Sequence, residues 1–233
     1  KYNVLKTPEH ANSEVGISQT ILRSLTDEHD IFVCEMGAYN KGGIKLLAGI
    51  AKPDIGIVTG VNEQHLATFG SMENLLSAEG GEELAISLPK NGALIVNGNN
   101  KYCRELYEKT ESQEKILCYT ISAAAEIMSS EKSGLIAKNV VVEKENVSFQ
   151  VNDVKFRVAI YGGHNVENIL LAIAAARNFD MSLQEITKAC ETITPNMGAL
   201  QIRKGVNGLN IADSSYSANP NGVIADLEYI KIW

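Results

Sequence analysis

Short apolar runs alternate with longer helical patterns through the first half of the sequence, and this alternation limits the possible folds more than any other feature. Four of the runs predict strands: Ile31–Met36, Asp54–Thr59, Ala93–Asn97 and Lys115–Thr120. Apolar residues spaced three or four apart predict helices between them, over 13–25, 41–51, 71–88 and 100–109. Strands separated by helices form right-handed βαβ units, and strands that are apolar throughout are covered on both faces. The sequence therefore predicts an α/β fold with a mostly parallel sheet flanked by helices.

The pattern changes near Ser122, where shorter and more β-branched runs begin. Residues 140–143, 147–151 and 154–160 are joined by Asn-rich turns, which is typical of a small antiparallel element. Helices are expected from His164 and over 183–192. Two short strands around Asn207-Gly208 and a helix from Asn219 should follow. We place a domain boundary at Pro195, so that 1–195 forms one domain and 196–233 begins a second one.

Composition excludes several classes of partner and location. The formal net charge is −7, which argues against non-specific binding to nucleic acid or to anionic membranes. No apolar run reaches the length of a membrane-spanning helix, and no secretory signal opens the chain. The four cysteines form no CxxC pair, and three lie in apolar surroundings, as reduced thiols of a cytoplasmic protein do. We therefore expect a cytoplasmic protein. Because the chain starts with Lys1 and stops inside a helical pattern, we also expect a fragment.

Two polar residues follow buried strands at the edge where α/β proteins bind ligands. Glu35 comes at the end of the first predicted strand, immediately before Met36-Gly37-Ala38, and its oxygens could reach a magnesium ion. His65 follows the second strand in the same way, and a neutral imidazole can ligate a metal. The alternatives are a solvated glutamate at a strand end and a surface or packed histidine.

The predicted helix 71–88 has an acidic face that is interrupted by glycine. Glu79, Glu82 and Glu83 share one face at i,i+3 and i,i+4 spacing, which a solvated surface would also explain. Gly80-Gly81 inside a helix costs about 1 kcal/mol per glycine relative to alanine. We therefore expect another group to approach the backbone closely at this point.

Two further segments carry polar groups at helix starts or strand ends. Asn165 and Asn168 can project from one side of the first turn of their helix, and their amides offer the donor and acceptor that an adenine edge needs. N-capping by His164 or Asn165 is the alternative reading. Asp213 lies at another strand end. Capping of the following helix explains Asn219-Pro220 but gives no reason for an aspartate at position 213.

Five segments together resemble the Mur ligases, ATP-dependent enzymes that join an amino acid or dipeptide to a peptidoglycan precursor. They occur in the order of the family and span nearly the whole chain: TPEHANSEVGI from Thr7, CEMGA from Cys34, TGVNEQHLATFGSMENL from Thr59, GGHNVENILLAIAAA from Gly162 and ADSSYSANP from Ala212. The branch that they resemble most is the UDP-N-acetylmuramoyl-tripeptide:D-alanyl-D-alanine ligases. The resemblance implies most of the central ATP-binding domain, then the start of a Rossmann-like C-terminal domain. The family's phosphate-binding GxxGKT/S loop occurs nowhere in the sequence and would lie upstream of Lys1.

The resemblance also implies a mechanism and a set of site residues. Family members phosphorylate a substrate carboxylate with ATP, and an amine then attacks the acyl phosphate, with Mg²⁺ offsetting charge in both steps. By motif match, Glu35 and His65 would ligate magnesium. Asn165 and Asn168 would contact adenine, and Asp213 would lie near the nucleotide and the incoming amine. The substrates implied are a UDP-linked muramoyl peptide and an amino acid or dipeptide.

The sequence departs from the family pattern at three places. Glu79 stands where the family commonly has a carbamylated lysine, so we expect it to supply that negative charge without CO₂ chemistry and to join Glu35 and His65 as a catalytic magnesium ligand, through water if its shorter reach requires it. Gly198-Ala199 replaces a Gly-Arg pair, and Thr59-Gly60-Val61 replaces Thr-Asn-Ile.

We therefore expect an ATP-dependent carbon–nitrogen ligase in the intact protein and no activity in this fragment. Two alternatives stay open. One is a non-catalytic nucleotide- or partner-binding module, and the other is a related ligase of the folylpolyglutamate or cyanophycin type.

Overall fold

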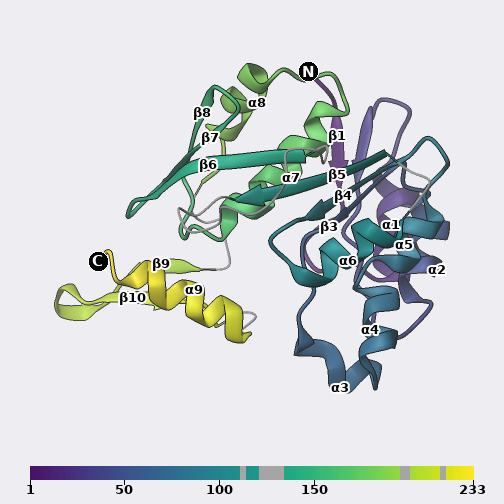
Figure 1. Ribbon diagram of the computed structural model, residues 1–233, viewed down its shortest axis with the longest axis horizontal. Helices are drawn as coiled ribbons and strands as arrows, with labels where there is room; N and C mark the ends of the chain where they lie inside the picture. The colour runs from purple at the N-terminus through teal and green to yellow at the C-terminus, as the bar shows by residue number, and fades with distance from the viewer. Residues whose placement is uncertain (111–113, 121–133, 195–199, 216–218) are drawn as a thin grey trace. The chain divides into compact units, whose positions relative to one another are not determined.

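The computed structural model describes residues 1–110, 114–120, 134–194, 200–215 and 219–233 (Figure 1). The chain forms two compact units. The first contains residues 1–96 and 100–115, and the second contains residues 97–99 and 116–233. The predicted change of pattern near Ser122 lies outside the described residues. So does the predicted boundary at Pro195, which stays a prediction.

The strands of the first unit pair in parallel. β1 (Val4–Lys6) lies beside β2 (Ile31–Val33), and β3 (Ile55–Val58) lies beside β4 (Ala93–Asn97). β4 is buried along its whole length, as a strand covered on both faces should be. The prediction of a buried strand over 31–36 is wrong in its second half. β2 ends at Val33, because the following residues form a loop instead of continuing the ladder. The strand is also less buried than predicted, and the Val33 side chain is 54% exposed. The short strand β1 gave no signal in the sequence.

Side-chain caps begin several helices of this unit. Ser13 caps α1 (Glu14–Ser24) by accepting a hydrogen bond from the Gly16 amide at 3.3 Å, and Asn100 caps α6 (Lys101–Lys109) in the same way. α2 (Gly43–Ala51) lies close to the predicted range, and a 3₁₀ turn, η1 (Glu63–His65), leads into the short helix α3 (Leu66–Phe69). Apolar side chains of these elements form one core cluster: Ile17, Ala38, Ile44, Leu47, Val61, Phe69, Leu75 and Ala78.

The single helix predicted over 71–88 is wrong. The segment forms two helices, α4 (Met72–Ala78) and α5 (Glu82–Ser87), which separate at Gly80-Gly81. Gly81 has φ +88°, a left-handed conformation that ends one helix and begins the next. A Cβ atom on Gly81 would lie 2.6 Å from Cγ2 of Val58 and 2.9 Å from Cδ2 of Leu106. The expected close approach to this backbone is therefore real, and core side chains make it.

The second unit combines one parallel strand pair with an antiparallel meander. β5 (Glu114–Thr120) runs parallel to β6 (Gly134–Val142), and β7 (Val147–Val151) and β8 (Val154–Val158) follow as antiparallel strands. Phe149 and Phe156 stack across β7 and β8 with ring centroids 5.2 Å apart, and both are buried. α7 (Asn165–Arg177) and α8 (Leu183–Cys190) follow the meander. A capping box of Ser182 and Glu185 begins α8.

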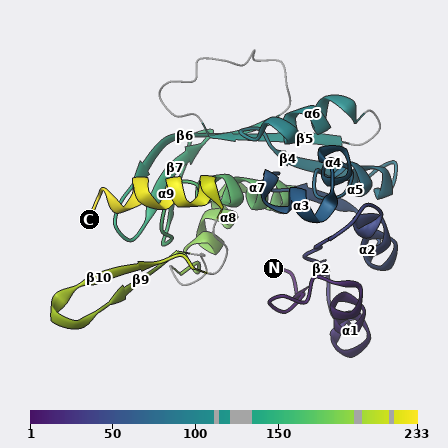
Figure 2. The same ribbon diagram turned by 90° about the horizontal axis from the view of Figure 1, so that it is seen from below.

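The chain ends with a β-hairpin and a helix, as predicted. β9 (Gln201–Lys204) and β10 (Asn210–Asp213) pair around the turn η3 (Val206–Gly208), where Asn207 and Gly208 both have positive φ. Asn219 caps α9 (Pro220–Ile230), and Figure 2 shows the hairpin as a two-stranded ribbon. The predicted α/β class, with parallel strands, flanking helices and a small antiparallel element, is confirmed. No helix in the described residues is long and apolar enough to span a membrane.

Candidate functional site

Glu35 stands two residues beyond the end of β2, and residues that follow β1 hold it there. Its backbone N–H donates to the Thr7 hydroxyl at 3.1 Å, and its Oε1 accepts a hydrogen bond from the Asn12 amide at 3.1 Å. The Gly37 N–H also donates to the Asn12 carbonyl at 3.0 Å. Oε2 of Glu35 has no partner among the described residues, and the side chain is exposed. One carboxylate oxygen is thus fixed, and the other is available to a ligand.

His65 and Glu79 are brought together from different elements. Nδ1 of His65, in η1, lies 2.7 Å from Oε1 of Glu79, at the end of α4, and both side chains are partly exposed. The break before α5 puts Glu79 at a helix end. A carboxylate on one imidazole nitrogen orients the ring and leaves the other nitrogen, Nε2, for a ligand.

The segments that carry these three residues share one core. Met36 and Ala38 follow Glu35, Val61 and Leu66 flank His65, and Leu75 and Ala78 precede Glu79; all six belong to or pack against the same apolar cluster. The backbone around each predicted ligand is thus anchored to a common set of side chains. Sequence reasoning identified the three residues, and tertiary packing places their segments in one unit.

The donor atoms suit a hard divalent cation that is shared with a nucleotide. Carboxylate oxygens are the ligands that Mg²⁺ prefers, and it usually takes one or two of them together with water and substrate phosphates. Among the residues that the structure describes, no group of three or more His, Cys, Asp or Glu side chains is placed to hold a metal ion, so Glu35 does not join the His65–Glu79 pair in one ligand cluster. Glu35 and the His65–Glu79 pair therefore suit an open magnesium site that water and substrate phosphates would complete, not a dedicated all-protein site.

The first turn of α7 carries the two predicted adenine ligands, Asn165 and Asn168. They differ in how many of their side-chain hydrogen-bonding groups are already used. Nδ2 of Asn165 donates to the Tyr161 carbonyl at 2.7 Å and lies 3.1 Å from Nε2 of His164, so its N–H groups are occupied and its oxygen remains. Asn168 is exposed and forms no side-chain hydrogen bond within the described segments. Desolvation lowers the pKa of His164, against the opposing effects of Asp226 and Glu167. A neutral His164 ring keeps Nε2 able to accept the bond from Asn165.

A carboxylate that sequence reasoning missed anchors the same turn. Glu167 accepts hydrogen bonds from Nδ2 of Asn97 and Nδ2 of Asn99, each at 2.7 Å, and Asn99 also bonds to the Thr120 hydroxyl. Asn97 is 5% exposed, so this network is partly buried. The partners lie far apart in the sequence, so no local pattern identified them; the only signal was an asparagine-rich stretch after a buried strand.

Comparison with known proteins identifies the family. Residues 1–176 match the model of the Mur ligase middle domain.

This chain belongs to the Mur ligase family.

Among curated relatives, the UDP-N-acetylmuramoyl-tripeptide–D-alanyl-D-alanine ligase of Bacillus subtilis is 27% identical over 230 residues, which cover 98% of this chain and 47% of the relative. The Escherichia coli ligase of the same name is 28% identical over 233 residues, covering 98% of this chain and 49% of the relative. The chain therefore spans about half the length of the curated relatives that it matches.

Solved Mur ligase structures share the fold. The crystal structure of MurF from Acinetobacter baumannii superimposes with a TM-score of 0.84 at 22% identity, over all of this chain and 49% of that one. MurF from Thermotoga maritima, solved in complex with ADP, gives a TM-score of 0.81 at 20% identity, over all of this chain and 52% of that one.

Asp213 is held by its own neighbours in this Mur ligase chain. Its Oδ1 accepts hydrogen bonds from the Ser215 N–H at 3.2 Å and the Ser215 hydroxyl at 2.7 Å, and Oδ2 lies 3.1 Å from Arg203. The hydrogen bonds from Ser215, and then the charge of Arg203, lower the pKa of the carboxyl. Its predicted contact with nucleotide or amine stays a prediction. Gly198-Ala199, where the family has an arginine, lies outside the described residues.

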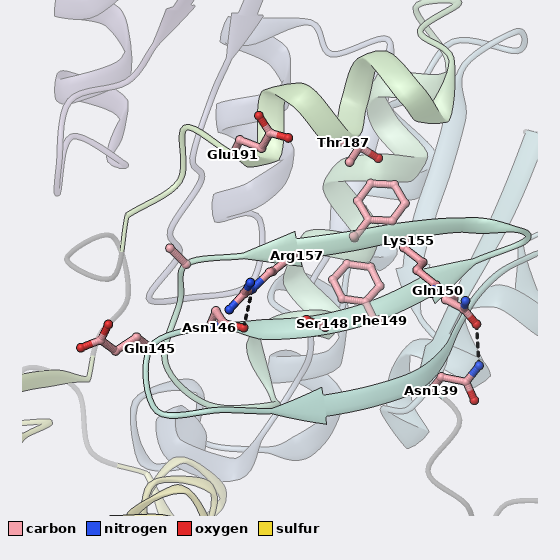
Figure 3. A pocket seen from close by; sticks show the side chains of 12 residues that line it. Asn139, Glu145, Asn146, Ser148, Phe149, Gln150, Lys155, Arg157, Thr187 and Glu191 are labelled. Atoms are coloured by element: carbon pink, nitrogen blue, oxygen red, sulfur yellow. Dashed lines mark hydrogen bonds between the residues drawn. The ribbon is translucent and has the colours of Figure 1, made fainter.

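The second unit has a pocket of its own. It has a volume of about 900 Å³ and is lined by side chains of the β6–β8 meander and of α8 (Figure 3). Nε of Arg157 donates to Oδ1 of Asn146 at 3.1 Å, and Asn139 bonds to Gln150, so much of the polar lining is already paired. None of the predicted site residues lines this pocket.

Proposed function

We propose that the intact protein is an ATP-dependent ligase of peptidoglycan precursor synthesis that joins D-alanyl-D-alanine, or a similar amine, to a UDP-linked muramoyl peptide. The contact between His65 and Glu79 carries the proposal, because it joins two residues that the family resemblance assigned to the metal. The curated relatives named for this reaction and the ADP complex of a structural relative support it. Such a ligase acts in the cytoplasm.

The reaction has two steps. In the first, an oxygen of the substrate carboxylate bonds to the γ-phosphorus of ATP, the bond to the β-phosphate oxygen breaks, and ADP leaves. In the second, the amine nitrogen attacks the carbonyl carbon of the acyl phosphate, phosphate leaves with the electrons of its C–O bond, and the amine gives up a proton. A bound magnesium ion would offset negative charge in both steps.

The residues of this chain hold and orient the reactants. Glu35 and Glu79 would hold the metal with their free oxygens, and His65 would present Nε2 because Glu79 occupies Nδ1. Asn165 would accept a hydrogen bond from the adenine amino group, and Asn168 can both donate and accept. We also propose that 1–195 belongs to the ATP-binding domain and that 196–233 begins the C-terminal domain, with Asp213 near their junction.

The test uses the intact protein with ATP, Mg²⁺, UDP-muramoyl tripeptide and D-alanyl-D-alanine. ADP release should require both acceptor substrates and should fall by about 10²-fold or more in Glu35→Gln. Glu73→Gln is the matched control, since this α4 glutamate is exposed and, within the described part of the chain, its side chain pairs with Lys41 alone, at 3.7 Å. ADP release that needs no D-alanyl-D-alanine and accepts another amine would favour the folylpolyglutamate or cyanophycin type of ligase.

The 233-residue chain should release no more ADP than its Glu35→Ala variant, because the phosphate-binding loop does not occur in its sequence. Nucleotide binding by the intact protein without any turnover would instead favour a non-catalytic binding module. The alanine at position 199, in place of the family's arginine, motivates that second candidate.

A further inference from the structure

Glu83 is a buried carboxylate that the proposed mechanism does not use. It lies in α5, is 5% exposed, and accepts three hydrogen bonds. Oε1 accepts from the Gly42 N–H at 2.6 Å and from the Ser77 hydroxyl at 3.2 Å, and Oε2 accepts from the Lys45 N–H at 3.0 Å. Burying a carboxylate is costly unless it is paired or hydrogen-bonded, and these three hydrogen bonds meet that condition.

Two of these bonds cap α2 from a distant part of the chain. Gly42 is the N-cap residue of α2, has φ +91° and supplies no side-chain cap of its own. In an ordinary capping box, two side chains of the same helix satisfy the N–H groups of the N-cap and N3 residues. Here the two oxygens of Glu83 satisfy both groups, and their negative charge lies at the positive end of the helix. α2 and α5 pack against each other, so this cap joins two helices.

The three bonds also connect the segments that carry the predicted metal ligands. Gly42 ends the loop that begins after Glu35, so the bond at 2.6 Å fixes the far end of that loop. Ser77 lies in the last turn of α4, two residues before Glu79, which bonds to His65. A single carboxylate thereby links the loop that follows Glu35 to the helix end that carries Glu79, the partner of His65.

We propose that Glu83 is a positioning residue that sets the relative geometry of Glu35 and the His65–Glu79 pair. It contacts neither substrate nor metal and acts through the backbone of α2 and through Ser77. The role for magnesium rests on the proposed function, whereas the effect of Glu83 on the His65–Glu79 contact does not.

The test compares three variants of the 233-residue chain by NMR. Glu83→Gln keeps the size of the side chain and replaces one acceptor oxygen with a donor that faces another donor. Amide hydrogen exchange at Gly42 and Lys45 should become at least about tenfold faster. The ¹⁵N shifts of the His65 ring should move from their wild-type values, since its bond to Glu79 loses its support.

Glu82→Gln is the matched control, because this neighbour in α5 is half exposed and pairs with Lys109 at 3.5 Å. It should change neither observable. Ser77→Ala is the milder variant if Glu83→Gln folds poorly. It should move the His65 ring shifts while Gly42 and Lys45 stay protected.

Binding of Mn²⁺, used alone as a probe for the magnesium site, gives a second measurement. Its Kd should rise about tenfold or more in Glu83→Gln and stay unchanged in Glu82→Gln. Glu83 is only a helix cap, and the proposal is overturned, if Glu83→Gln speeds amide exchange but leaves the His65 ring shifts as in wild type. Failure of the wild-type chain to bind Mn²⁺ better than Glu35→Ala would count against the metal site of the proposed function. The ring shifts would still decide the role of Glu83.

Discussion

The break between α4 and α5 depends on Gly81, and replacing this residue with alanine should cost more than at Gly42 or Gly70, the other positive-φ glycines described in this unit. Gly81 needs a left-handed backbone, with φ +88°, and its Cα faces the side chains of Val58 and Leu106. The break places Glu79 at a helix end beside His65 and leaves Glu83 in the next helix. Gly81→Ala therefore tests the feature that organises the candidate site.

The magnitude follows from two separate costs. A left-handed conformation costs an alanine about 1–2 kcal/mol relative to glycine. The added Cβ would lie 2.6 Å and 2.9 Å from carbon atoms of Val58 and Leu106, and overpacking of this kind costs about 1–3 kcal/mol. Together they predict a loss of about 2–5 kcal/mol in the free energy of unfolding. For a chain of this size that corresponds to a fall in Tm of about 4–20 °C.

Two other glycines separate these costs. Gly70 has φ +73° and nothing within 4 Å of its Cβ position, so Gly70→Ala should lose only the backbone part, about 1–2 kcal/mol. Gly49 lies inside α2, is exposed and also has open space, so Gly49→Ala should gain about 0.5–1 kcal/mol through helix propensity. Urea unfolding of the three variants, followed by far-UV circular dichroism, measures the series.

The expected order of stability is Gly49→Ala, then wild type, then Gly70→Ala, then Gly81→Ala. Equal losses at positions 70 and 81 would refute the reasoning, because they would mean that Val58 and Leu106 do not confine the backbone at the break. A gain of helical signal in Gly81→Ala, with stability retained, would refute it in another way, since the two helices would then have merged.

Other substitutions test the remaining contacts. In the intact protein, Glu79→Gln should weaken Mg²⁺-dependent turnover, and added bicarbonate should not restore it; unchanged Mg²⁺ dependence would remove Glu79 from the metal site. Glu167→Gln should lower the free energy of unfolding by about 1–2 kcal/mol in urea titrations, because two asparagine side chains lose their charged acceptor. Ser182→Ala should cost about 0.5–2 kcal/mol by removing the capping box of α8, and no change would show that this helix end is frayed. Desolvation holds the pKa of His164 below the ordinary 6.5, so the unfolded chain binds more protons between the two values. The stability of the folded chain should therefore fall as pH drops below 6.5, and His164→Gln should flatten this slope in unfolding curves measured between about pH 5 and 8.

Local patterns predicted most of the secondary structure because caps, turns and periodicity act between residues that are near in sequence. Ser13, Asn100 and Asn219 cap helices that periodicity predicted close to their observed ranges, and Asn207-Gly208 forms the expected turn. The sequence failed where a local pattern was ambiguous. The acidic stretch 71–88 fits one helix by periodicity, and only the crowding around Gly81 shows that it must break. β1 is too short to give any periodic signal.

The candidate site shows the same division. The sequence by itself determined which residues have suitable chemistry: the carboxylates Glu35 and Glu79, the imidazole of His65 and the amides of α7. Only the tertiary structure decided that Glu79 bonds to His65, that Glu167 anchors the first turn of α7, and that Glu83 caps α2. Each of these bonds joins parts of the chain that are far apart in sequence. Their formation depends on how the helices pack, and no spacing along the chain encodes it.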